Sequence, residues 1–226
     1  MRRWTRWGVA ALSATATMVL STGTAEAATT AALWHMENPS VMTDSSGNGN
    51  NGTTTGITSV AGVSGKAYHF NGRNSVVTVP DSPSLNPANA NLKIIARVRF
   101  TVVPSAAVGD YDLVRKGLAG TAGGEWKMEI FPPAGNTSGT AFCLFQDVNQ
   151  KTASIRDTRN LADGAWHTIS CVKTATAVKV IVDGVTRSTP ASLGSISNTK
   201  PLTVGAKSGG GNQFLGDMDE VSIQVG

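Results

Sequence analysis

The densest group of carboxylates in the sequence is the segment GDMDEVSI at 216–223. Asp217 and Asp219 alternate there, so on a strand both side chains would face the same way, about 6.5 to 7 Å apart. A retaining glycosidase needs two carboxyl groups about 5 to 5.5 Å apart. A hard cation such as Ca²⁺ instead takes six to eight oxygens and mixes carboxylates with carbonyls. The pattern favours an ion site, with Asp219 as the natural carboxylate.

The other polar motifs lack the partners that catalysis requires. The three histidines lie far apart, and no Gly-x-Ser-x-Gly segment supplies the serine of a nucleophilic triad. The run KSGGGN at 207–212 has no strand-to-helix context and does not predict a phosphate site. DSSGNGNNG at 44–52 lacks the glutamate of an EF-hand calcium loop, so Asp44 is expected to cap its own turn. We interpret these motifs as structural.

The first 27 residues have the three parts of a secretory signal peptide. Arginines precede an apolar and small-residue run at 8–20, and Ala-Glu-Ala at 25–27 forms a cleavage site. The run is too short and too rich in Ser and Thr for a membrane anchor of roughly 20 apolar residues. We expect a secreted, extracellular protein that begins at Ala28 and has no transmembrane segment. The arginine pair at positions 2 and 3 leaves the twin-arginine export route open.

The 199 residues that remain, 28–226, contain no Pro- or Ser-rich linker and are predicted to form one domain. Of 19 basic and 15 acidic residues, three arginines and one glutamate lie in the signal segment. The mature chain therefore keeps 16 basic and 14 acidic residues, a net charge of +2. The basic residues are scattered singly rather than clustered. This excludes nucleic acid as an expected partner.

The apolar residues of the mature chain occur in short alternating runs bounded by Gly, Asn, Asp or Pro, with no sustained helical period. The runs predict thirteen strands, at 31–36, 66–71, 75–79, 91–100, 110–116, 125–131, 140–147, 152–157, 165–174, 178–183, 185–189, 202–206 and 217–225. Asp183-Gly184 predicts a tight two-residue hairpin turn. Asn71-Gly72 predicts a four-residue loop. So many short strands indicate an all-β sandwich.

Cys143 and Cys171 are the only cysteines, and both lie in strand-like segments. An even pair in an exported chain predicts a disulfide, because the compartment is oxidising. The alternative is two buried free thiols on neighbouring strands. Two cysteines without a histidine at ligand spacing exclude a four-ligand zinc site.

Seven motifs are distributed along nearly the whole mature chain: LWHME at 33–37, DSSGNGNNG at 44–52, GKAYHFNG at 65–72, LADGAWHTISCV at 161–172, VIVDG at 180–184, LTVGAKSGGG at 202–211 and GDMDEVSI at 216–223. In this order and spacing the chain resembles the LamG-like, concanavalin A-like lectin and glucanase jelly rolls, in particular secreted single-domain forms. The resemblance implies two curved antiparallel sheets of about six strands each, with the N- and C-terminal segments paired. It also implies that the two cysteine strands lie in or near one sheet.

The resemblance further implies a structural calcium that ties the C-terminal strand to the N-terminal one. Its ligands would be Asp219, a carbonyl at Gly72 or Asn71, and a residue around Met36 or Glu37. Glu37-Asn38 departs from the Asp-Glu that relatives commonly carry on this strand.

The related glucanases carry a Glu-x-Asp-x-x-Glu type signature, which is missing here. EWKMEI at 125–130 supplies Glu125 and Glu129 without the central aspartate. We therefore expect a module that binds a carbohydrate or another cell-surface ligand without turnover. The expected stacking residue is Trp126, because its charged neighbours indicate exposure. The alternatives are a glucanase-type polysaccharide hydrolase and an adhesion domain without a small ligand.

Overall fold

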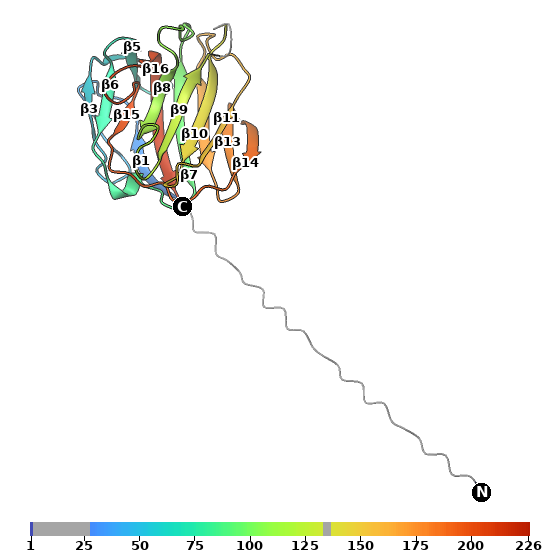
Figure 1. Cartoon of the computed structure of the whole chain (residues 1–226). Coiled ribbons are helices and arrows are strands. Elements are labelled where there is room, and N and C mark those ends of the chain that lie inside the picture. The colour runs from blue at the N-terminus through green and yellow to red at the C-terminus, as the bar shows by residue number, and fades with distance from the viewer. Residues whose placement is uncertain (2–27, 133–136) are drawn as a thin grey trace.

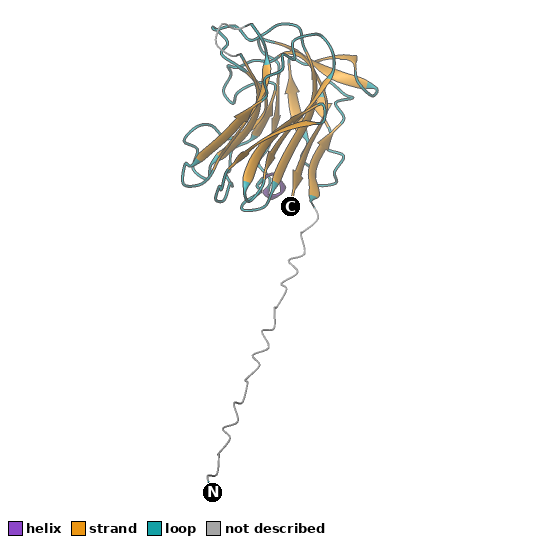
Figure 2. Cartoon of the chain, turned by 90° about the vertical axis from the view of Figure 1, so that its right-hand side faces the viewer, coloured by secondary structure: helices purple, strands orange, loops and turns teal. Residues whose placement is uncertain are grey.

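The computed structural model describes Met1 and residues 28–132 and 137–226. These residues form two packed antiparallel sheets of eight strands each, so the predicted all-β sandwich is confirmed (Figure 1). Strands and loops make up almost all of the domain, with one short 3₁₀ turn, η1, at Pro83–Leu85 (Figure 2). The predicted signal peptide at 1–27 lies, apart from Met1, outside the described residues. No helix in the described part of the chain is long and apolar enough to cross a membrane.

Sheet A contains the strands that begin and end the domain. Its order is β14 (Val185–Pro190), β13 (Ala177–Val182), β12 (His167–Lys173), β7 (Leu92–Arg99), β16 (Leu215–Val225), β5 (Lys66–Asn71) and β4 (Thr58–Ala61), with β1 (Thr29–Trp34) also paired to β16. Thr29 lies opposite Val225 and Trp34 opposite Val221. The expected pairing of the N- and C-terminal segments is therefore confirmed.

Sheet B packs against sheet A and carries the candidate site. Its order is β11 (Thr152–Arg156), β10 (Thr140–Gln146), β9 (Glu125–Phe131), β8 (Tyr111–Lys116), β15 (Leu202–Val204), β6 (Val76–Val79), β3 (Gly52–Thr55) and β2 (Val41–Met42). Each of the thirteen predicted strands corresponds to one of these sixteen. Strands β2, β3 and β4 were not predicted, because β2 has only two residues and the Thr, Ser and Gly residues of β3 and β4 give no alternating apolar pattern. The expectation of about six strands in each sheet was therefore too low.

Strand β7 shows how the alternation in the sequence builds the core. Leu92, Ile94, Ala96 and Val98 are fully buried between the sheets, whereas the residues between them are half-buried on the outer side. Successive side chains of a strand point to opposite faces, so one apolar residue in two is enough to fill the interior. Burying a side chain the size of Leu or Ile contributes roughly 1.5–3 kcal/mol.

The predicted disulfide joins Cys143 to Cys171, with 5.5 Å between the two Cα atoms. Cys143 lies on β10 of sheet B and Cys171 on β12 of sheet A. The expectation that both strands lie in or near one sheet was wrong, and the bond instead crosses the core between the sheets. Sheets packed face to face are usually about 10 Å apart. The two sheets therefore approach each other closely at this pair.

Two predicted turns are confirmed. Asp183 and Gly184 both have positive φ, 49° and 79°, and join β13 to β14. Asp44 caps its own turn, since its carboxylate accepts the backbone N–H groups of Ser46 and Asn50, each at 2.9 Å. It also accepts the N–H of Leu33 at 3.0 Å, which attaches this turn to β1.

Four residues separate β5 from β6, as Asn71-Gly72 predicts, but these two strands belong to different sheets. The connection therefore crosses from one sheet to the other instead of closing a hairpin.

Candidate functional site

The face of sheet B that points away from the core carries charged side chains on strand β9. Glu125, Lys127 and Glu129 alternate along the strand with Trp126 and Met128. The last two are fully buried in the core. Because alternate residues of a strand point to opposite faces, the three charged side chains all lie on the outer face.

Strand β8 adds two further charges to this face because it contains a β-bulge. Asp112 pairs with Glu129 and Arg115 with Lys127, and the register shifts between Asp112 and Val114. Residues 112 and 115 are three positions apart, so regular alternation would place them on opposite faces. The extra residue of the bulge brings both onto the outer face.

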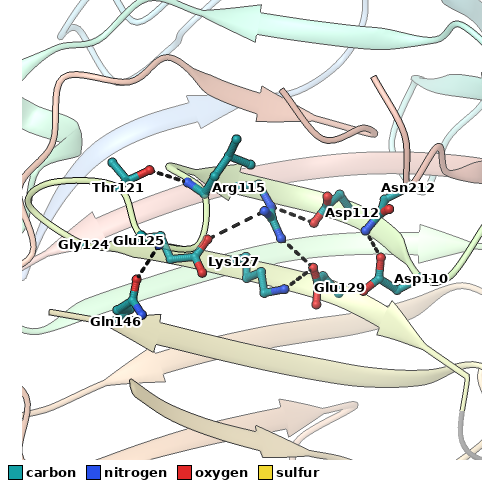
Figure 3. A network of polar contacts seen from close by, with 12 residues as sticks. Asp110, Asp112, Arg115, Thr121, Gly124, Glu125, Lys127, Glu129, Gln146 and Asn212 are labelled. Atoms are coloured by element: carbon teal, nitrogen blue, oxygen red, sulfur yellow. Dashed lines mark hydrogen bonds and ion pairs between the residues drawn. The ribbon is translucent and has the colours of Figure 1, made fainter. Parts of the chain in front are cut away.

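These five residues form a charge cluster that we define as Asp112, Arg115, Glu125, Lys127 and Glu129 (Figure 3). Arg115 lies at its centre. Its Nε is 2.9 Å from Asp112 Oδ1, its Nη2 is 2.8 Å from Glu129 Oε1, and its Nη1 is 3.7 Å from Glu125 Oε2. Lys127 Nζ lies 2.6 Å from Glu129 Oε1. The side chains of Arg115 and the three acidic residues are at most 6% exposed.

The cluster contains one more carboxyl group than it has cations, which favours the retention of one proton. Burial and the neighbouring charge of Glu129 raise the pKa of Asp112 to about 8. Asp112 Oδ2 and Glu129 Oε2 are buried and have no hydrogen-bond partner among the described residues. A proton on Asp112 that is shared with Glu129 satisfies both oxygens. At neutral pH we therefore assign Asp112 as the neutral acid of the cluster.

The segment at 205–213, which we call the glycine-rich loop, leads from β15 towards β16 and lies beside the cluster. The backbone N–H of Asp112 donates to Asn212 O at 2.9 Å, and the Asn212 side-chain amide donates to Asp110 (Figure 3). The loop also forms one wall of a pocket of about 260 Å³, whose floor includes Thr203 of β15. The cluster and the pocket therefore share one loop.

The outer face of β9 and β10 also carries a pair of phenylalanines, Phe131 on β9 and Phe142 on β10. Phe142 lies opposite Glu129 in the β9–β10 ladder, and its ring centroid is 5.7 Å from that of Phe131. Lys127 Nζ lies 5.8 Å from the centroid of the Phe142 ring, and the Arg156 guanidinium lies 5.5 Å from that of Phe131. Both phenylalanines are half-buried. This part of the face is a partly open aromatic surface edged by cations.

The prediction that Trp126 is an exposed stacking residue was wrong. Its side chain is fully buried, because its neighbours Glu125 and Lys127 lie on the opposite face of the strand. The indole Nε1–H has no acceptor among the described residues. Trp166, on the side of sheet A, is half-buried instead, and the guanidinium of Arg99 lies 4.7 Å from its ring centroid.

Two of the predicted calcium ligands, Asp219 and Glu37, hold the turn between β4 and β5. Asp219 is fully buried, and its Oδ2 accepts the backbone N–H of Val63 at 2.7 Å. Glu37 Oε2 accepts the N–H of Lys66 at 3.1 Å. Met36, which precedes Glu37, is buried with a φ of 57°.

The other two, Asn71 and Gly72, lie at the far end of β5. Asn71 pairs with Leu215, and Asp219 follows four residues later on β16, about 13 Å along the strand. The predicted residues therefore do not surround one point, and as a complete set they do not fit one ion. No three His, Cys, Asp or Glu side chains in the described ranges are grouped to hold a metal. A calcium ion at Asp219 and Glu37, with carbonyls of the turn, stays a prediction.

Asp217, the other carboxylate of the C-terminal segment, is held by a histidine and an arginine on sheet A. His69 Nδ1 lies 2.7 Å from its Oδ1, and Arg99 Nη2 lies 2.9 Å from its Oδ2. Both carboxylate oxygens are therefore already occupied.

The carboxyl groups of the charge cluster are held inside the protein, whereas the neighbouring aromatic rings and the pocket are more open. A carboxyl group that acts as a general acid or base must lie within hydrogen-bond reach of the substrate. In this structure Asp112, Glu125 and Glu129 all face Arg115, so their carboxyl groups are directed at an internal cation. A ligand can instead reach the half-buried Phe142 and the pocket beside the glycine-rich loop.

The family model described as the concanavalin A-like lectin/glucanases superfamily matches residues 71–224, well over half of the chain. No curated protein sequence matches the chain.

Solved structures match the domain over most of its length. The binding domain of Paraclostridial Mosquitocidal Protein 1 is 20% identical, with a TM-score of 0.71, and the match covers 86% of this chain and 48% of that chain. Domain 4 of AbnA, a GH43 extracellular arabinanase from Geobacillus stearothermophilus solved in complex with arabinotriose, is 18% identical, with a TM-score of 0.66 and coverage of 88% and 93%. The binding domain of botulinum neurotoxin serotype G is 15% identical, with a TM-score of 0.65 and coverage of 86% and 47%. This chain spans about half the length of the binding domains of Mosquitocidal Protein 1 and of the serotype G neurotoxin.

Proposed function

The chain belongs to the concanavalin A-like lectin/glucanases superfamily, and within that family we propose that it is a carbohydrate-binding module. One observation carries the proposal. The match to the arabinanase domain, which was solved with arabinotriose, covers 93% of that domain at a TM-score of 0.66. The shared unit is therefore a whole domain that holds an oligosaccharide in the relative.

The outer face of sheet B is the surface we assign to the ligand. A sugar ring presents an apolar C–H face and a rim of hydroxyl groups, so it needs an aromatic surface with polar groups beside it. Phe131 and Phe142 supply the aromatic surface, and Lys127 and Gln146 lie on the same face of β9 and β10. A few half-buried rings support only weak binding. We therefore expect dissociation constants in the high micromolar to millimolar range, which correspond to a binding free energy of about 4–6 kcal/mol.

Export is part of the same proposal. The arginine-containing start, the apolar run and the Ala-Glu-Ala site at 25–27 support removal of residues 1–27 and an extracellular location. An extracellular module of this kind meets polysaccharides and cell-surface glycans.

A binding experiment on residues 28–226 tests the proposal. We expect the protein to retain at least one class of oligosaccharide on a glycan array that includes arabinan, xylan, glucan and galactan fragments. Phe142→Ala should weaken that binding about tenfold, because it removes the aromatic contact. Trp166→Ala is the matched control, since it removes a half-buried aromatic ring from the side of sheet A and should leave the affinity unchanged.

Two results would count against the proposal. The first is no binding by the folded wild-type protein to any glycan of the array. The second is the release of new reducing ends from a bound polysaccharide, which would favour the hydrolase alternative.

A further inference from the structure

The pocket beside the glycine-rich loop contains polar atoms that the protein itself leaves without partners. Thr203 is 3% exposed, and its Oγ1 has no hydrogen-bond partner among the described residues. Gln213 Oε1, on the loop, is also buried without a partner in that part of the chain. Both residues line the same pocket of about 260 Å³. Leaving a buried polar atom without a partner is unfavourable, so both oxygens indicate a site for a hydrogen-bonding ligand.

The register of β15 explains why Thr203 faces the pocket. Leu202 and Val204 are fully buried in the core, and Thr203 between them points to the outer face. It lies between Arg115 of β8 and Thr78 of β6, its partners in the two ladders. The pocket is therefore on the same face of sheet B as Phe142. Three strand spacings separate β15 from β10, about 14 Å.

The remaining walls of the pocket combine apolar and polar groups. Val76 and Pro201 supply apolar surface, whereas Thr78 and Lys207 supply a hydroxyl and a cation. A sugar ring has the same two-sided character. The pocket volume is large enough for one monosaccharide unit but not for a long segment of chain.

The unpaired atoms themselves indicate an uncharged ligand. Gln213 Oε1 can only accept a hydrogen bond, and Thr203 Oγ1 can also accept one. The hydroxyl groups of a neutral sugar can donate to both oxygens, whereas a carboxylate has no hydrogen to donate.

We propose that this pocket is the subsite that holds one neutral sugar unit, with its hydroxyl groups donating to Thr203 Oγ1 and Gln213 Oε1. The inference rests on the proposed function and specifies where on the outer face of sheet B the ligand is held. The half-buried Phe131 and Phe142 lie far enough from this pocket to contact another part of the same oligosaccharide.

Thr203→Val tests the subsite because it removes the hydroxyl and keeps the shape. Replacing an unpaired buried hydroxyl by a methyl group leaves stability unchanged or raises it, so we expect an equal or higher melting temperature. Affinity for the bound sugar should fall about tenfold, which matches the loss of one hydrogen bond. Thr186→Val is the matched control, because Thr186 is exposed on β14 of sheet A. The Thr186→Val variant should bind the sugar with the wild-type affinity.

The titration uses arabinotriose, neutral xylo-, gluco- and galacto-trisaccharides, and a galacturonic acid trisaccharide, followed by two-dimensional NMR. In the wild type, the amide signals of residues 205–213 should shift with a neutral sugar. Wild-type binding that persists unchanged in Thr203→Val and in Gln213→Met would overturn the subsite and leave the proposed function standing. Tighter binding of the galacturonic acid trisaccharide than of the neutral sugars would contradict the proposal that the subsite holds an uncharged sugar unit. No binding of any sugar by the wild type would overturn both proposals.

Discussion

Replacing Asp112 by asparagine should make the protein more stable at neutral and alkaline pH. Burial, with the charge of Glu129, raises the pKa of Asp112 to about 8, from an ordinary value of 3.8. Asparagine has nearly the same shape and is always neutral. Its amide can donate to Glu129 and its oxygen can accept from Arg115, as the protonated acid does.

The sign of the effect follows from the raised pKa. Below about pH 3.8 Asp112 is protonated in both the folded and the unfolded chain, and its contribution to stability is complete. Between about pH 3.8 and 8 the unfolded chain releases the proton while the folded protein keeps it. Unfolding therefore becomes more favourable as the pH rises through this window. The variant has no such proton, so its stability relative to the wild type should increase with pH.

The size of the effect can be worked from the same numbers. Each pH unit inside the window changes the free energy of unfolding by up to about 1.4 kcal/mol. From about pH 3.8 to pH 7 this gives an upper limit of about 4 kcal/mol. Asp112 and Glu129 interact strongly and share part of the effect. We therefore expect Asp112→Asn to raise the free energy of unfolding by about 2–4 kcal/mol at pH 7 relative to its effect at pH 4.

Urea unfolding at pH 2.5, 4, 5.5, 7 and 8.5, followed by tryptophan fluorescence, measures the difference between variant and wild type. Asp147→Asn is the control with the opposite sign. Burial raises the pKa of Asp147, but the backbone N–H groups of Gly194, Lys151 and Asn149 outweigh it and lower the pKa. Its stabilising effect should be present above about pH 4 and lost at lower pH. A difference between Asp112→Asn and the wild type that stays constant from pH 4 to 8.5 would refute the reasoning.

Two further predictions concern features outside the cluster. The double variant Cys143→Ala/Cys171→Ala should lose about 3–4 kcal/mol of unfolding free energy in urea, because the bond closes a loop of 28 residues; unchanged stability, or alkylation of the native protein without reductant, would contradict this. Calcium should stabilise the folded protein by about 2.7 kcal/mol when its concentration is a hundredfold above the dissociation constant. The melting temperature should therefore rise with calcium, and Asp219→Asn should abolish this rise. Identical melting curves in calcium and in chelator would contradict a calcium site at Asp219, whose role would then be to hold the turn between β4 and β5.

The fold could be predicted from the sequence because the buried residues of a sandwich repeat with period two. Strand β7 and strand β13 each alternate strictly between buried and half-buried residues, and the turn at Asp183-Gly184 has the residue types that its positive φ angles require. Pairing between strands is not encoded locally. The sequence placed Cys143 and Cys171 on two strands but could not assign those strands to opposite sheets.

The candidate site was harder to predict because its residues are charged, yet buried. The charges at 125, 127 and 129 alternate with apolar residues, and this spacing was a usable signal for one charged face on β9. The same signal would have placed Trp126 inside. Asp112 and Arg115 have the wrong spacing for one face, and only the bulge in β8 brings them together. The unpaired oxygens of Thr203 and Gln213 depend on the packing of the glycine-rich loop, which has no pattern in the sequence.

The charge cluster connects the stability of the domain to its proposed ligand site through the glycine-rich loop. Asn212 bonds to Asp110 and to the backbone of Asp112. Buried ion pairs add little net stability compared with apolar packing, and Asp112 lowers stability above about pH 4. We infer that the cluster serves to fix the loop in one arrangement. Asp112→Asn keeps this geometry and removes only the proton, so it should raise stability while leaving sugar affinity unchanged. A loss of affinity in that variant would instead show that the cluster itself takes part in binding.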